Sequence, residues 1–108
     1  MDLTYASYLR IPELLTLQSP RSDGPEHDEH LFIVIHQVYE LWFKQELHET
    51  EQLVRLLDRD DQVGAEATLV RMLTILKTMV AQIDVLETMT PVSFLSFRDF
   101  LASSSGFQ

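Results

Sequence analysis

Apolar residues recur every three or four positions through most of this chain, which is the spacing of amphipathic α-helices. The pattern predicts one long helix from residues 26–29 to about Arg59, and a second that begins after residue 61 and ends before Thr90. The apolar positions that carry the pattern are Val38, Leu41, Trp42, Leu53, Leu56 and Leu57 in the first helix, and Val63, Ala67, Val70, Leu73, Leu76, Val80, Ile83 and Leu86 in the second. Strand patterns are nearly absent. We therefore predict an all-α fold with two long antiparallel helices and short helices at their ends.

Capping residues and prolines mark the ends of these helices. Asp60 or Asp61 can cap the second long helix with its carboxylate. Thr90 followed by Pro91 predicts the start of a third, short helix, because proline is well tolerated at the first helical position. Near the N-terminus, Pro12 predicts a short helix that restarts after a break.

These breaks divide one all-α segment, residues 1–108, into three parts. We predict an N-terminal arm over residues 1–18, a linker over residues 19–25 and a helical core over residues 26–108. Residues 31–35 are apolar on every face, which predicts burial on all sides. A helix of about thirty residues is roughly 45 Å long, more than a compact monomer of this size can cover. We therefore expect the chain to oligomerise or to be part of a longer polypeptide.

Composition and charge exclude several classes of partner. Among 108 residues, 8 lysines and arginines stand against 17 acidic residues, for a net charge of -9. Such a balance argues against nucleic-acid binding, which needs clustered basic residues. The absence of cysteine excludes disulfides and thiolate metal sites. No apolar run is long enough to span a bilayer and the first residues do not form a signal peptide, so we expect a cytoplasmic protein without a membrane partner.

Histidines raise the question of a metal site. His27 and His30 are three residues apart on a predicted helix, a spacing that could offer two imidazoles to a metal, although a solvated helix start is the favoured interpretation. A carboxylate-bridged di-iron bundle needs Glu-x-x-His from two helices. The residues three positions before the other two histidines are Ile33 and Gln45, so that site is excluded. We predict no metal site formed by side chains of this chain.

Two polar residues in apolar surroundings are candidates for ligand binding. His36 follows five apolar residues, and a buried imidazole needs a hydrogen-bond partner, for which Glu40 is a local candidate. Arg98 lies among aromatic residues, where it can pair with Asp99 or Glu87, or bind a ligand carboxylate through its planar guanidinium. The residues alone favour structural roles for both and leave the binding roles open.

Other residues of the first long helix are assigned less specific roles. Trp42 and Phe43 are interpreted as core residues because of their spacing from Val38. Three acids, Glu46, Glu49 and Glu51, are interpreted as a solvated face.

Four segments of the chain resemble the heme-dependent tryptophan 2,3-dioxygenases, in order and in spacing. Residues 27–44, HDEHLFIVIHQVYELWFK, resemble the long N-terminal helix of that family. Residues 4–9 resemble its Thr-Tyr-x-x-Tyr-Leu opening, residues 85–91 its mid-chain motif and residues 97–108 the segment that follows. The resemblance spans nearly the whole chain and implies that the helices form part of a helical heme dioxygenase fold.

The resemblance also implies roles for individual residues. His36 corresponds to the distal histidine that accepts a hydrogen bond from the substrate indole N–H, and Arg98 to the arginine that pairs with the substrate carboxylate. The other substrate-binding positions it implies are Phe32, Ile33, Val34 and Ile35 in the wall of the indole pocket, Phe94 beside the carboxylate, Tyr5 and Tyr8 in an arm that enters a neighbouring subunit, and Ser105 in a loop that closes over the site.

The implied reaction inserts both atoms of O2 across the indole C2–C3 bond of L-tryptophan to give N-formyl-L-kynurenine, in tryptophan catabolism by the kynurenine pathway. The implied cofactor is heme b, and the implied assembly is a homotetramer. The proximal heme histidine of the family lies in a C-terminal half that these residues do not match, so we expect an N-terminal fragment that is inactive alone. The alternative is a non-catalytic helical oligomerisation module derived from the same family.

Overall fold

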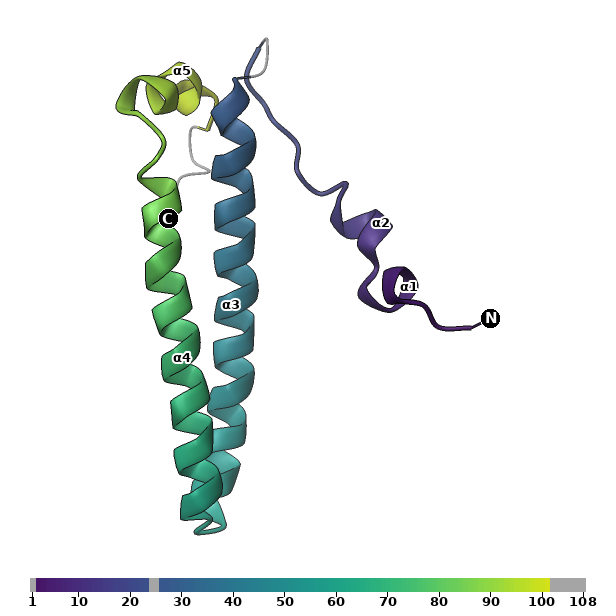
Figure 1. The fold of residues 1–108 in the computed structure, drawn as a ribbon, viewed down its shortest axis with the longest axis vertical. Coiled ribbons are helices and arrows are strands. Elements are labelled where there is room, and N and C mark those ends of the chain that lie inside the picture. Colours follow the sequence, from purple (N-terminus) through teal and green to yellow (C-terminus); the bar gives the residue numbers. More distant parts are fainter. Residues whose placement is uncertain (1, 24–25, 102–108) are drawn as a thin grey trace. The chain divides into compact units, whose positions relative to one another are not determined.

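A computed structural model describes residues 2–23 and 26–101 of the chain (Figure 1). The described residues form α-helices and no strand, which confirms the all-α prediction. No helix in this part of the chain combines the length and the apolarity needed to cross a membrane. The helices are α1 (Tyr5–Leu9), α2 (Ile11–Leu14), α3 (His27–Asp58), α4 (Gln62–Leu86) and α5 (Pro91–Leu101).

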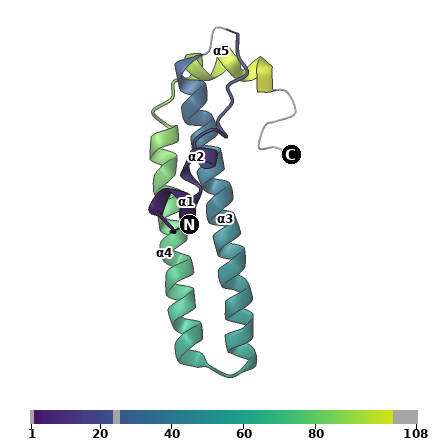
Figure 2. The ribbon, with the colours of Figure 1, turned by 90° about the vertical axis from the view of Figure 1, so that its right-hand side faces the viewer.

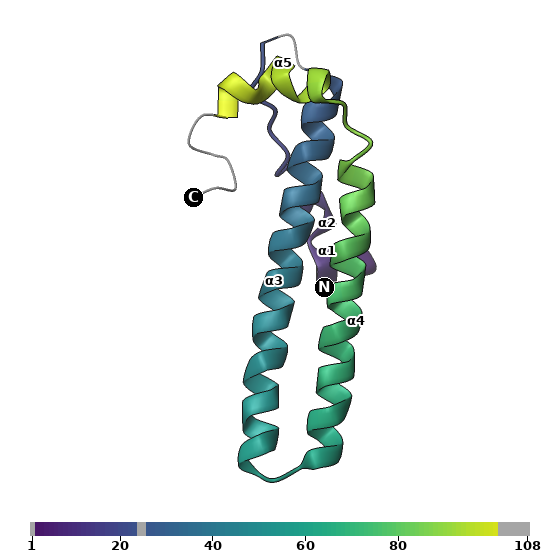
Figure 3. The same cartoon turned by 90° about the vertical axis from the view of Figure 1, so that its left-hand side faces the viewer.

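The chain folds as two compact units. The terminal unit comprises Met1–Val34 and Thr90–Gln108, and the hairpin unit comprises Ile35–Met89. The terminal unit therefore contains α1, α2, the first turns of α3 and α5. The hairpin unit contains the rest of α3 and all of α4, which run antiparallel side by side (Figures 2 and 3).

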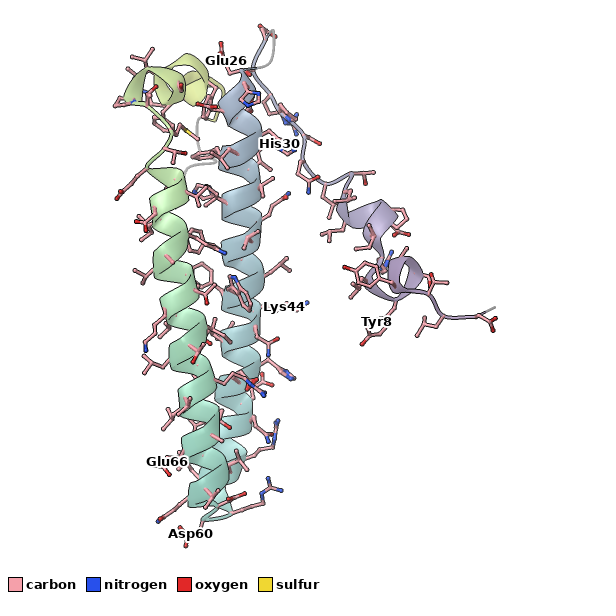
Figure 4. All side chains as sticks on the ribbon, in the orientation of Figure 1. Tyr8, Glu26, His30, Lys44, Asp60 and Glu66 are labelled. Carbon is pink, nitrogen blue, oxygen red and sulfur yellow. The ribbon has the colours of Figure 1, made fainter. Side chains whose placement is uncertain are left out.

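The turn of the hairpin unit is set by two aspartates. Asp60 adopts a left-handed backbone conformation with φ of 56°, which reverses the chain directly after α3 (Figure 4). Asp61 then caps α4, because its carboxylate accepts a hydrogen bond of 2.9 Å from the backbone N–H of Gly64. The predicted cap is confirmed at the second of the two candidate residues.

Buried positions in the hairpin unit follow a heptad spacing that defines what we call the hairpin seam. On α3 the buried residues are Ile35, Glu49 and Leu56, and on α4 they are Ala65, Thr68, Ile75 and Met79. Half-buried Tyr39 connects the two helices, since its hydroxyl donates a hydrogen bond of 2.7 Å to the carbonyl oxygen of Met79. The seam therefore includes polar and charged side chains as well as apolar ones.

The face of α4 that enters the seam differs from the predicted apolar stripe. Val63 is 81% exposed and Leu76, near the middle of the predicted stripe, is 46% exposed. The same holds for Val70, Leu73, Val80 and Ile83, whose exposed fractions lie between 43% and 65%. Apolar residues occur on more than one face of α4, so the periodicity alone could not identify the face that packs against α3. The buried face contains Ala65, Thr68, Ile75 and Met79 instead.

An aromatic cluster forms the core of the terminal unit. The rings of Phe32, Phe94 and Phe97 lie within 5.6 to 5.9 Å of one another, centroid to centroid, and Phe97 is completely buried. Phe94 and Phe97 belong to α5, whose start is capped as predicted. The hydroxyl of Thr90 accepts a hydrogen bond of 3.1 Å from the backbone N–H of Ser93.

The N-terminal arm consists of two short helices with exposed side chains. Thr4 caps α1 through a reciprocal pair of hydrogen bonds with Ser7. Arg10, with φ of 55°, separates α1 from α2, and Pro12 lies in the first turn of α2 as the sequence predicts. Tyr8 on α1 remains 70% exposed (Figure 4).

Candidate functional site

The predicted site residues are distributed over both units. Ile35 and His36 belong to the hairpin unit. Ser105 lies outside the described residues. The terminal unit contains the remaining positions, namely Tyr5, Tyr8, Phe32, Ile33, Val34, Phe94 and Arg98.

Phe32 and Phe94 are the two predicted substrate residues that the terminal unit brings together. Their ring centroids are 5.9 Å apart, and the ring planes are tilted by 38°. Both side chains are half-buried, while Phe97 behind them is fully buried. An aromatic surface that is partly open and held by a third ring can pack against the flat ring of a ligand.

Burial around the predicted pocket wall is less complete than the sequence suggests. Residues 31–34 are half-buried and only Ile35 of the apolar run is buried. The expectation of burial on every side was therefore wrong for this chain by itself. The two short helices of the arm and the single helix α5 in the terminal unit offer too little surface to cover all faces of the first turns of α3.

Arg98 lies near the end of α5 and its side chain is exposed. Within the described part of the terminal unit, its guanidinium forms no ion pair. A pairing with Asp99 cannot be assigned, since the side chain of Asp99 lies outside the described set. An exposed guanidinium near an aromatic cluster is suited to binding the carboxylate of an aromatic amino acid.

His36 is half-buried on α3, directly after the buried Ile35. A neutral imidazole has one nitrogen that accepts a hydrogen bond, which is the chemistry required to bind an indole N–H.

Tyr5 and Tyr8, the two aromatic residues of the arm, are 78% and 70% exposed. Among the described residues no ring contact joins them to Phe32 or Phe94. Two exposed tyrosines on a capped helix form a surface that is suited to contact with another polypeptide or a ligand.

The segment His27–His30 does not form a metal-binding cluster. In residues 2–23 and 26–101, no group of three histidine or acidic side chains is arranged to hold a metal ion. His27 and His30 are exposed, whereas Glu29 between them is fully buried and bonded to the linker at Arg21 and Ser22. Glu29 could not be identified from the sequence, because its partners are seven and eight residues away in an irregular segment.

The prediction of a solvated acidic face was wrong for two of its three residues. Glu49 is buried and accepts hydrogen bonds of 3.2 Å from Arg71 and from Gln45. Glu46 is half-buried, and its Oε1 atom has no hydrogen-bond partner among the described residues. Burial, together with the negative charge of Glu49, raises the pKa of Glu46. The spacing of Glu49 by fourteen residues from Ile35 and by seven from Leu56 is the heptad signal that could have identified it.

A groove in the hairpin unit was also missed. It has a volume of about 650 Å³ and is lined by Val38, Leu41, Trp42, Lys44, Gln45, His48 and Gln82. Trp42 is half-buried in its wall, and among the described residues its indole nitrogen has no hydrogen-bond partner. Phe43 is 47% exposed, so the prediction that it is a core residue was wrong. Its position falls outside the heptad of the seam.

Comparisons with known proteins identify relatives along the full sequence. A family model described as tryptophan 2,3-dioxygenase matches residues 1–108. Proteins named tryptophan 2,3-dioxygenase are 67% identical in Herpetosiphon aurantiacus, 61% identical in Anaeromyxobacter dehalogenans and 44% identical in Aedes aegypti. Each of these matches covers 98% of this chain, but only 41%, 39% and 29% of the respective relative. The chain thus spans about two fifths or less of the length of these relatives.

Proposed function

The chain belongs to the tryptophan 2,3-dioxygenase family, and we propose that it forms the N-terminal, substrate-binding portion of a heme-dependent dioxygenase. The complete enzyme would insert O2 across the indole C2–C3 bond of L-tryptophan and release N-formyl-L-kynurenine. The observation that carries the proposal is the match of 67% identity over 98% of this chain to a protein of that name.

In this proposal Arg98 binds the substrate carboxylate. A guanidinium forms two parallel hydrogen bonds to a carboxylate, which fixes the orientation of the amino acid as well as its charge. The exposed side chain of Arg98 and the lack of an ion pair to it within the described terminal unit support this role.

The indole ring of the substrate packs against half-buried Phe32, with Ile33, Val34 and Ile35 completing the pocket wall, and Phe94, in contact with Phe32, lies beside the substrate carboxylate. The contact between the rings of Phe32 and Phe94 in the terminal unit supports this arrangement. His36 accepts the hydrogen bond of the indole N–H and so selects the orientation of the ring. Tyr5 and Tyr8 cover the site of a neighbouring subunit in a homotetramer, and Ser105 belongs to the closing loop.

Heme b supplies the oxygen chemistry of this reaction when it is bound. The described residues do not fit a complete heme site, because no side chain among them can be assigned as the axial ligand of the iron. His27, His30 and His48 are exposed on α3, and His36 is assigned to the substrate. We therefore assign to this chain the binding and orientation of tryptophan and the exclusion of water, and we place the axial ligand outside residues 1–108.

The substitution Arg98→Ala tests the proposal in the complete enzyme of which this chain would be the N-terminal portion. Loss of the charge pair is expected to weaken the binding of L-tryptophan by about 2–5 kcal/mol, seen as a rise in KM. Arg98→Lys keeps the charge but loses the bidentate geometry, and is expected to recover only part of the affinity. Arg55→Ala, an exposed arginine in the last turns of α3, serves as the matched control. Normal tryptophan binding by Arg98→Ala would show that the role is wrongly assigned.

A second candidate function is a helical oligomerisation module without catalytic activity. The exposed apolar side chains of α4 favour it, since Val63, Val70 and Val80 are each more than 60% exposed. Sedimentation of the heme-free chain separates the two. A stable dimer or tetramer without affinity for tryptophan or heme supports the module, and a monodisperse monomer removes it.

A further inference from the structure

The carboxylate of Glu29 is completely buried, although it lies in the first turn of α3. Its Oε2 atom accepts a hydrogen bond of 2.7 Å from the backbone N–H of Arg21. Its Oε1 atom accepts two more, of 3.1 Å from the backbone N–H of Ser22 and of 2.6 Å from the Ser22 hydroxyl. One side chain of α3 therefore binds two consecutive peptide N–H groups of the linker.

Ser22 completes this arrangement from the linker side. While its hydroxyl donates to Glu29, the same oxygen accepts a hydrogen bond of 3.2 Å from the backbone N–H of Glu26, at the start of α3. We refer to Arg21, Ser22, Glu26 and Glu29 as the linker clasp. Its four hydrogen bonds tie an irregular segment to the helix start, and they satisfy one of the helix N–H groups that would otherwise lack a partner.

The chemistry of the clasp keeps Glu29 charged. Burial by itself raises the pKa of a carboxyl group, but the hydrogen bonds from Ser22 and Arg21 and the charge of Arg21 outweigh it, so that the pKa of Glu29 is lowered. The favourable interaction of an acid with the helix N-terminus does not require burial, since the neighbouring Asp28 supplies it from a half-buried position. The burial of Glu29 is instead accounted for by its bonds to the linker.

The clasp lies between the arm and the pocket wall. Residues 1–18 of the arm carry Tyr5 and Tyr8, and Phe32 lies one turn of α3 beyond Glu29. We propose that Glu29 is a positioning residue, which sets the point where the arm leaves α3 and thereby the placement of Tyr5 and Tyr8 at the tryptophan site. This inference rests on the proposed function. Glu29 touches neither substrate nor cofactor and acts through the backbone of Arg21 and Ser22.

Limited proteolysis by trypsin reports directly on the clasp, because the Arg21–Ser22 peptide bond is held by it. Trypsin also cleaves after Arg10, between α1 and α2, which gives an internal reference in the same molecule. In Glu29→Gln the amide offers one acceptor where the carboxylate had two, and cleavage after Arg21 is expected to accelerate about tenfold while cleavage after Arg10 is unchanged. Asp28→Asn removes a charge from the same helical turn without touching the clasp, and should change neither rate.

Kinetics of the complete enzyme test the positioning role. Glu29→Gln is expected to raise KM for L-tryptophan several-fold and to leave kcat within about twofold, whereas Asp28→Asn leaves both unchanged. Ser22→Ala removes the hydroxyl but keeps both peptide N–H groups, so it provides a milder variant with an intermediate effect if Glu29→Gln folds poorly.

Three results would overturn the inference. Unchanged cleavage after Arg21 in Glu29→Gln and in Ser22→Ala would mean that the clasp does not hold the linker. Faster cleavage with an unchanged KM would mean that the clasp holds the linker without positioning the arm. Absence of tryptophan turnover in the unsubstituted enzyme would overturn the proposed function, and this role of Glu29 with it.

Discussion

Arg71 on α4 pairs with Glu49 on α3, with 3.2 Å between its Nη1 atom and Oε1 of Glu49. The two side chains differ greatly in exposure, since that of Arg71 is 68% exposed and that of Glu49 is 6% exposed. Gln45 donates a second hydrogen bond to the same carboxylate oxygen. The hairpin seam thus contains a buried charge whose partner is mostly in solvent.

The substitution Arg71→Ala is expected to lower the free energy of unfolding by about 0.5–1 kcal/mol, because water screens the exposed half of the pair. Urea unfolding of the single and double variants measures the coupling. Glu49→Gln combined with Arg71→Ala should cost less than the sum of the two single changes. Lys77→Ala, at another exposed cation of α4, is the control. Strict additivity would show that the pair contributes nothing.

The substitution Glu46→Gln is expected to stabilise the chain at neutral pH. Burial and the charge of Glu49 raise the pKa of Glu46 in the folded state, so the folded chain favours the protonated carboxyl. The stability that this group contributes is therefore complete below the unfolded-state pKa, and is lost as the pH rises through the folded-state pKa.

Because glutamine resembles the protonated form at every pH, the gain should be present at pH 7 and absent below about pH 4. Thermal unfolding of both proteins across this range measures it. Glu51→Gln, an exposed position on the same helix, should show no such trend. Equal stability of Glu46→Gln and the unsubstituted chain at pH 7 would contradict the prediction.

Removal of the Phe97 ring is expected to cost about 3–5 kcal/mol, the range for deletion of a fully buried aromatic side chain. Phe97→Ala leaves Phe32 and Phe94 without the ring that both contact. Leu95→Ala is the control on the same helix, because Leu95 is 52% exposed and should cost less than about 1 kcal/mol. Denaturant unfolding provides both values, and a small loss in Phe97→Ala would mean that the cluster can collapse onto the vacated space.

Tyr39→Phe isolates the single hydrogen bond to the carbonyl oxygen of Met79. The ring remains, including its stacking on Phe43 at 6.3 Å between centroids, so the change removes only the hydroxyl. The expected loss is about 1 kcal/mol, the usual net value of such a bond. Tyr8→Phe removes an exposed hydroxyl and should leave the free energy of unfolding unchanged.

The helix boundaries could be predicted because they depend on local chemistry. Thr4, Asp61 and Thr90 each cap the helix that follows through a backbone N–H three residues on, and such bonds are encoded within one turn of chain. The first long helix was expected to begin between residues 26 and 29 and observed from His27, for the same reason.

Apolar periodicity alone did not identify the buried faces, since these depend on partners far away in sequence. Glu49 carries a local signal in its heptad spacing from Ile35 and Leu56, but its ion-pair partner Arg71 lies twenty-two residues later on α4. The choice between Thr68 and Val70 for the buried face of α4 depends on where α3 lies, and apolar residues are present on both faces.

For the candidate site, the resemblance identified Phe32 and Phe94, and their contact is now part of the described fold. The roles of His36 and Arg98 stay predictions. Glu29 could not be found from its motif, because a carboxylate between two histidines is typical of a solvated helix start and only the fold of the linker buries it.

The short turn at Asp60 has a consequence for the order in which the chain folds. Only residues 59–61 separate α3 from α4, so closing the hairpin orders few residues and costs little chain entropy. The contact between Phe32 and Phe94, by contrast, joins segments on either side of the whole hairpin in sequence, and must await a much larger loop closure. We therefore expect the hairpin to be the early, rapidly formed nucleus, and the aromatic surface proposed to receive the indole ring to be among the last features to form.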